Sequence, residues 1–231
     1  MIVRIRLTMK DSRHDRVLRS YNLNLLNILD CQYTGTGVPQ LEPCHVIPER
    51  LRAFTFCKNS TDEQVGIHFF IDDHRFSWCW SDPNKYIPML KRFACVLTPD
   101  FSVYVDMPLP LQRFNTFRNR AVGWIWQQQS IEVIPTLRWG FPESYEFCFD
   151  GLPQGGVVAL STLGLMVNEE CIELFREGAA EGVRRSQPSA ILAYGQHCDF
   201  DSGGTSVYWH ENDVIARLRT IKRKDNSEGS E

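Results

Sequence analysis

The stretch VGIHFFIDD, residues 65–73, decides the expected fold, because a continuous apolar run stops abruptly at two aspartates. Apolar runs that are bounded by turns in this way are typical of buried parallel strands. Because parallel strands all end on the same side of a sheet, their polar end residues are expected to share one rim. Four more runs follow the same pattern and lie at residues 95–97, 131–134, 157–160 and 191–193.

Helix-length segments separate these apolar runs. The longest cover residues 108–129 and 168–185, where apolar side chains recur at the spacing of one helix face. A shorter helix is expected to begin at Asp82-Pro83, since Asp caps helices and Pro suits the first helical position. Residues 206–218 are expected to form a strand or turn followed by a helix.

Five or six strands that alternate with helices predict an α/β fold with mainly parallel strands. An incomplete or compact (β/α) barrel-like fold is favoured, because a classical eight-unit barrel usually needs more than 231 residues. Polar residues also end nearly every strand instead of clustering at one crossover. An open doubly wound sheet is the alternative.

The chain divides into three parts in this interpretation. Residues 1–50 combine a short alternating stretch with a loop rich in Gly and Pro, and they are expected to form an N-terminal extension or cap. Residues 51–220 form the α/β domain, whose first strand is expected within residues 51–56. Residues 221–231 are polar and contain several acidic residues, so they are expected to be a disordered tail.

Composition argues against several functional classes. The net charge of −3 gives the chain no overall attraction to nucleic acid, although basic residues gather near the N-terminus and at residues 217–224. No apolar segment reaches the length of a membrane span, and the charged N-terminus does not match a signal peptide. The eight cysteines lack the regular spacing of a disulfide scaffold. We therefore expect a cytoplasmic protein with no membrane partner.

Carboxylates at two strand ends are the candidate catalytic groups. Asp72 and Asp73 end one apolar run and Asp100 ends the next. Such a cluster either holds a divalent metal ion or divides the roles of general acid and general base. His74 follows the aspartate pair and is the candidate general base, since histidine titrates near neutral pH. Each aspartate also fits a structural role, because Asp caps helices and turns at such positions.

A second group of polar residues is expected to bind substrate. The two arginines in this group suit an anion, the tryptophan offers a ring for stacking, and the hydroxyl groups precede a flexible turn. Two of the residues share one polar helix face, which is equally typical of a solvated surface. The candidates are Asn115, Arg118, Arg138, Trp139, Ser161 and Thr162.

Several motifs together resemble a known family. They are HFFIDDHRF (68–76), LTPDFSVYVDMP (97–108), NTFRNR (115–120), VIPT (133–136) and SYEFCFDGLP (144–153). The chain from residue 65 to residue 196 is similar to a family of phage and mobile-element proteins that is catalogued as a domain of unknown function. The resemblance implies a phage, prophage or plasmid setting and action in the host cytoplasm, and it carries no established activity.

A fainter resemblance leads to tRNA-guanine transglycosylases, barrel enzymes that exchange a base by means of strand-end aspartates. It implies that Asp100 acts as nucleophile or base, and that Arg138 and Trp139 line a base pocket. The sequence departs from that family at Asp100-Phe101-Ser102, where the family has an Asp-Ser-Gly-Gly run. It also contains no four-ligand zinc pattern.

Three functions are compatible with these observations. The first is a hydrolase, or a glycosyl or phosphoryl transferase, that acts on a nucleotide or nucleic acid. The second is a non-catalytic binding module that sequesters a host protein or a nucleotide signal. The third is an accessory protein that associates with DNA or RNA through the basic chain ends. The strand-end aspartates favour the enzyme.

Overall fold

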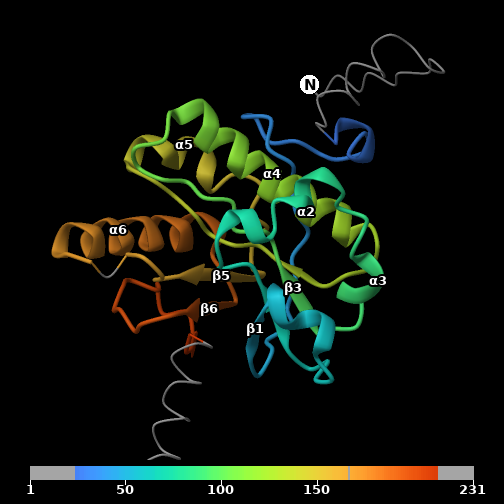
Figure 1. Cartoon of the computed structure of the whole chain (residues 1–231). Helices are drawn as coiled ribbons and strands as arrows, with labels where there is room; N and C mark the ends of the chain where they lie inside the picture. Colours follow the sequence, from blue (N-terminus) through green and yellow to red (C-terminus); the bar gives the residue numbers. More distant parts are fainter. Residues whose placement is uncertain (1–23, 166, 213–231) are drawn as a thin grey trace, which may run out of the picture.

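The computed structural model describes residues 24–165 and 167–212, and Figure 1 shows the arrangement of their helices and strands. The alternating stretch near the N-terminus, the basic residues at both chain ends, and residues 221–231 lie outside the described residues. Within the described part, no helix is both long and apolar enough to span a membrane.

Seven short strands form the framework of the described part of the protein. The first sheet contains, in spatial order, β1 (Leu51–Ala53), β2 (Gly66–His68), β3 (Cys95–Leu97) and β4 (Val133–Ile134). The second sheet contains, also in order, β5 (Val157–Ser161), β6 (Ala190–Tyr194) and β7 (Val207–His210). All five strand pairs are parallel. A parallel bridge between Thr136 and Ala159 joins the two sheets, so the strands follow one another in space as they do along the chain.

The strands surround a shared interior. Because side chains alternate between the two faces of a strand, every second residue points to the same side. The inward residues of both sheets meet in one buried cluster, which includes Leu51, Cys95, Leu97, Ile134, Val157, Ala159, Ala190, Leu192 and Tyr194. Neither sheet reverses its strand order, as a doubly wound sheet would. The α/β fold with mainly parallel strands is thereby confirmed, and among the described residues no ladder pairs β7 with β1.

Helices cover the outside of this framework on two sides (Figure 1). Against the outward residues of β2, β3 and β4 pack α2 (Trp78–Ser81), α3 (Ile87–Leu90) and α4 (Leu109–Gln127). Against β5 and β6 packs α6 (Glu169–Ser186). The remaining helical segments of the described residues are short: α5 (Tyr145–Cys148), η1 (Leu25–Asn27), η2 (Phe54–Asn59), η3 (Asp73–Arg75) and η4 (Pro142–Ser144).

The helix ends follow from local chemistry. Before α6, the side chain of Asn168 accepts a hydrogen bond from the backbone N–H of Cys171 at 2.8 Å, which is the usual role of an N-cap asparagine. The helix expected at Asp82-Pro83 does not begin there, because α2 ends at Ser81 and α3 begins only at Ile87. Pro88 explains this late start, since proline fits only the first turn of a helix.

Residues 24–50 pack on the strands and on α4. Ile28, Leu41 and Cys44 are buried. The backbone N–H of Leu41 donates to the carbonyl oxygen of Gly151 at 3.0 Å, which ties this segment to the chain just before β5. These residues therefore belong to the same core as the strands.

Arg120 ties α4 to the carboxyl end of β4. Its side chain is 1% exposed, and it donates hydrogen bonds at 3.0–3.1 Å to the backbone carbonyl oxygens of Thr136, Cys148 and Asp150. Burial lowers the pKa of Arg120 to about 10, so the guanidinium stays charged at neutral pH. Its N–H groups donate to these carbonyl oxygens and are thereby satisfied although they are buried. This contact fixes the segment after β4, which enters the candidate site.

Candidate functional site

A cavity of about 840 Å³ lies at the carboxyl ends of the strands. Every strand contributes to it, either through its last residue or through the segment that follows, from Ala53 in β1 to Asn212 after β7. Parallel α/β proteins place their binding sites on this rim. Of the expected site residues, those that line the cavity are Asp72, Asp73, Asp100, Arg138, Trp139 and Ser161.

Asp100 is the buried carboxylate of this cavity. Its side chain is 5% exposed, and Oδ2 lies 3.5 Å from Nη2 of Arg138. Oδ1 is buried and has no hydrogen-bond partner among the described residues. Burial raises the pKa of Asp100 to about 6; Arg138 opposes this increase and Asp73 adds to it. A carboxyl group with a pKa near 6 can hold or release a proton close to neutral pH.

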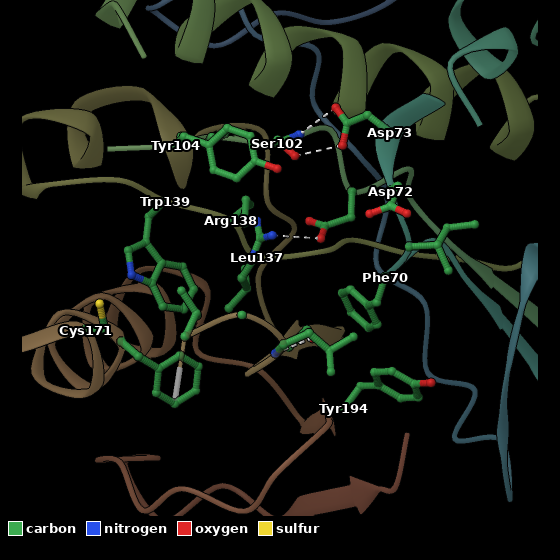
Figure 2. Close-up of a pocket in the computed structure, with 18 of the residues that line it drawn as sticks. Phe70, Asp72, Asp73, Ser102, Tyr104, Leu137, Arg138, Trp139, Cys171 and Tyr194 are labelled. Atoms are coloured by element: carbon green, nitrogen blue, oxygen red, sulfur yellow. Dashed lines mark hydrogen bonds and ion pairs between the residues drawn. The ribbon is translucent and has the colours of Figure 1, made fainter. Parts of the chain in front are cut away.

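Asp73 connects two of the segments that line the cavity. Its carboxylate accepts hydrogen bonds from the backbone N–H of Ser102 at 3.1 Å and from the Ser102 hydroxyl at 2.7 Å, as Figure 2 shows. Asp72 is 72% exposed and lies 3.6 Å from Nε of Arg75. The two adjacent carboxylates therefore differ, because one is fixed in the cavity wall and the other is solvated at the rim.

The three aspartates do not assemble into a metal site. Asp72, Asp73 and Asp100 each contact a different partner, as described above. Within residues 24–165 and 167–212, no group of three or more His, Cys, Asp or Glu side chains is placed to hold a metal ion. The arrangement suits acid–base chemistry by individual carboxylates better than shared coordination of a divalent ion.

Trp139 forms one wall of the cavity and is held against α6. Its ring nitrogen Nε1 donates to the carbonyl oxygen of Leu174 at 3.1 Å. A Cβ atom at position 178 would lie 2.0 Å from this nitrogen, so Gly178 is required for the ring to approach the helix. Ser161, at the end of β5, also lines the cavity, and its hydroxyl oxygen accepts from the N–H of Leu163 at 3.1 Å.

Two of the expected site residues, Thr162 and His74, do not line the cavity. Thr162 follows Ser161 but does not line the cavity; it is buried and its hydroxyl donates to the carbonyl oxygen of Gln196 at 2.8 Å. His74 lies in η3, is exposed to solvent and does not line the cavity. The expected general base therefore does not belong to the cavity lining that contains Asp100.

Asn115 and Arg118 do not line the cavity either, and they support its wall from α4. Asn115 donates from Nδ2 to the carbonyl oxygen of Ser102 at 2.6 Å, and its Oδ1 accepts from Arg118. The guanidinium of Arg118 lies 4.0 Å from the ring centre of Phe101. These two side chains hold the segment that contains Asp100 and Ser102, and they do not face a substrate in the cavity.

Sequence reasoning missed most of the aromatic lining of the cavity. The lining includes Phe70, Tyr104, Phe141, Phe175 and Tyr194, and Figure 2 shows Phe70 and Tyr194 close together. Those two rings stack with centroids 5.4 Å apart. Because both residues lie at strand ends, their positions in the sequence could have indicated that they line the cavity. The lining residues from α6, such as Cys171, could not have been found in this way, because nothing in the sequence indicates which face of a helix N-terminus meets a cavity.

His68 lies behind the two stacked rings. It is fully buried, its ring centre lies 4.2 Å from that of Tyr194, and its Nδ1 accepts from the N–H of Phe70 at 3.1 Å. Burial lowers the pKa of His68 to about 3, with a smaller contribution from His210. Since Nδ1 accepts, the neutral ring carries its proton on Nε2. That nitrogen has no hydrogen-bond partner among the described residues.

Comparison with known proteins finds relatives in phages. The profile described as "Domain of unknown function (DUF4417)" matches residues 32–208. The Gene 1 protein of Mycobacterium phage L5 is 41% identical over 167 residues, which are 70% of this chain and 73% of that protein. The Gene 1 protein of Mycobacterium phage D29 is 40% identical over 167 residues, which are 70% of this chain and 62% of that protein. No solved structure matches the chain.

Proposed function

We propose that this chain, which belongs to the DUF4417 family, is an enzyme, a hydrolase or transferase that acts on a nucleotide or nucleic acid. The observation that supports this best is Asp100, whose pKa is raised to about 6 and whose Oδ1 has no partner among the described residues. Carboxyl groups shifted by burial in a cleft are typical of catalytic sites. The relatives above are phage proteins, so we place this activity in the cytoplasm of a host cell.

Asp100 is the proton-transferring group in this proposal. Its protonated form donates to the leaving atom of the substrate, and its ionised form, stabilised by Arg138, takes a proton back. Oδ1 performs this step, because Oδ2 is turned toward Arg138. Asp73, which is fixed by Ser102, supplies a second carboxylate that stabilises positive charge on the substrate as the bond breaks.

Three further lining residues position the substrate in this proposal. Trp139 offers the face of an indole to a planar ring. Arg138, whose side chain is 23% exposed, and Ser161 line the same cavity. Asn115 and Arg118 act indirectly, because they hold the segment that contains Asp100.

The test compares two Asp→Asn variants. Nucleosides, nucleotides and short oligonucleotides are incubated with the protein, with and without a divalent cation, and the products are separated by chromatography. Asp100→Asn is expected to slow turnover by about 100-fold or more, since general acid–base catalysis contributes about that much. Asp199→Asn, at a side chain that is 95% exposed and outside the cavity lining, is the matched control. Equal turnover by Asp100→Asn and the wild type would reject the proposal.

A non-catalytic binding module is the second candidate, and the exposed apolar residues of the cavity favour it. Tyr104, Val105 and Phe141 line the cavity while remaining 58%, 43% and 47% exposed. Exposed apolar groups that cluster in this way are typical of binding surfaces. A module that sequesters a ligand should release an unchanged small molecule on denaturation, which mass spectrometry detects, and should form no product in the turnover assay.

A further inference from the structure

The cavity has an apolar side and an acidic side. The apolar side comes from α6 and from the segments after β4 and β5, and it contains Leu137, Trp139, Leu163, Leu165, Leu174 and Phe175. The acidic side comes from the segments after β2 and β3, which contribute Asp72, Asp73 and Asp100 beside apolar residues such as Val105. Figure 2 shows Trp139 and Cys171 on one side and Asp72 and Asp73 on the other, with Arg138 between them. A ligand that fills the cavity therefore needs one apolar part and one part that donates hydrogen bonds.

The charged groups of the cavity do not suit a phosphate. Among the described lining residues, the charged side chains are Asp72, Asp73, Asp100, Glu170, Arg75 and Arg138. Both arginines already pair with carboxylates, Arg75 with Asp72 and Arg138 with Asp100. A phosphate that entered would lose its hydration and meet an excess of negative charge.

A planar ring with N–H groups suits the same surroundings. Its faces gain contact with the indole of Trp139 and with the aliphatic residues of the apolar side. Its N–H edge supplies the hydrogen bond that Oδ1 of Asp100 lacks among the described residues. A buried acceptor without a partner is unfavourable, so a ligand that donates to it is favoured over one that does not.

We propose that the cavity binds the uncharged nitrogen heterocycle of its substrate, a nucleobase ring, and leaves any phosphate outside. This inference rests on the proposed function, because it names the part of the nucleotide that enters the site. The ring lies against Trp139 and donates to Asp100. The phosphate stays in solvent beyond the acidic side.

Cys171 provides a probe for occupancy of the cavity. It lines the cavity and is partly exposed, whereas the seven other cysteines are buried. The wild-type protein is treated with iodoacetamide in the presence of adenosine, guanosine, cytidine or uridine, and separately with inorganic phosphate or ribose 5-phosphate. Mass spectrometry then follows alkylation of Cys171, and Cys171→Ser identifies the modified peptide.

Protection by at least one nucleoside, and none by the two phosphate compounds, is the expected result. At about ten times its dissociation constant, the bound nucleoside slows alkylation by about tenfold, because only the unoccupied protein reacts. Asp100→Ala should weaken this protection, and Asp199→Ala, at the exposed control position, should not. Protection by phosphate or ribose 5-phosphate would overturn the inference, as would the absence of protection by all four nucleosides.

The experiments distinguish the absence of the proposed enzymatic activity from the absence of ring binding in the cavity. Alkylation needs no turnover, so nucleoside protection without any product would retain ring binding and reject the enzyme. Turnover of a phosphate-containing substrate that depends on Asp100, without nucleoside protection, would retain the enzyme and reject ring binding.

Discussion

Ser102 donates two hydrogen bonds to the carboxylate of Asp73, one from its backbone N–H and one from its hydroxyl group. These bonds join the segment after β3, which contains Asp100, to the segment after β2. Asn115 of α4 donates to the carbonyl oxygen of the same serine at 2.6 Å. The relative position of the Asp73 and Asp100 carboxylates therefore depends on a contact between loops that no sequence motif marks.

The Ser102–Asp73 contact is expected to contribute measurably to stability. Ser102→Ala removes the hydroxyl donor and keeps the backbone donor, so the free energy of unfolding should fall by about 1.5–3 kcal/mol, the range for a hydrogen bond to a charged group. Urea denaturation measures this change. Ser77→Ala, at an exposed serine with no side-chain cap hydrogen bond, is the control, and equal effects of the two substitutions would contradict the assignment.

Asp100 is expected to make the protein more stable in mild acid than at neutral pH. Its pKa is raised from 3.8 to about 6, so between these values the native state binds more protons than the unfolded state. The free energy of unfolding therefore falls as the pH rises, by up to about 3 kcal/mol from this group. Urea denaturation at several pH values should show that the free energy of unfolding falls more steeply with rising pH in the wild type than in Asp100→Asn. An unchanged slope in the variant would show that Asp100 is not the group responsible.

His68 is expected to act in the opposite direction. Burial lowers its pKa from 6.5 to about 3, so in this range the unfolded state binds a proton that the native state does not. The free energy of unfolding therefore falls as the pH drops below about 6.5, by about 2 kcal/mol at about pH 5. His68→Asn keeps an acceptor near the N–H of Phe70 and removes the titrating ring.

The measurement for His68 is the difference in unfolding free energy between neutral pH and about pH 5. The smaller asparagine side chain lowers the free energy of unfolding by the same amount at both pH values, so this loss cancels in the difference. His68→Asn should reduce the difference, whereas the exposed His45→Asn should leave it near the wild-type value. A similar reduction in both variants would rule out burial of His68 as the cause.

Gly178 is expected to tolerate no side chain. In Gly178→Ala the new Cβ atom would lie 2.0 Å from Nε1 of Trp139, which must then leave its place and lose its hydrogen bond to Leu174. Overpacking of this kind costs about 1–3 kcal/mol. In Gly182→Ala the nearest atoms are Cδ1 of Leu137 and Cε1 of Phe149, both at 3.0 Å, so the neighbours need a smaller shift and a smaller loss is expected. Thermal unfolding of the two variants, with tryptophan fluorescence as a second readout, tests this order.

Much of the fold was predictable, because buried parallel strands have a simple sequence pattern. The residues of β3, β5 and β6 are all buried, and each strand coincides with a continuous apolar run. β7 was expected only as a strand or turn, since its residues are partly exposed at the edge of the second sheet and lack that pattern. The resemblance to a phage-associated family was confirmed, and the match extends from residue 32 to residue 208.

The location of the candidate site was also predictable, but not all of its members were. Parallel strands must end on one side, which brought Asp73 and Asp100 to the same cavity. Which of two neighbours faces that cavity depends on the backbone direction after the strand ends, and this separated Ser161 from Thr162. The pairing of Asp100 with Arg138 depends on turn geometry that spacing along the chain does not specify.

The order of the strands has a consequence for how the protein is made. Each strand within a sheet lies beside its predecessor, and the Thr136–Ala159 bridge continues this order from β4 to β5. A strand that leaves the ribosome therefore meets a partner that has already emerged, and ordered assembly from the N-terminal side is available during synthesis. The cavity is completed last, because Asn212 after β7 belongs to its lining. A nascent chain that stops before Val207 would have most of its framework paired while its binding site was still open.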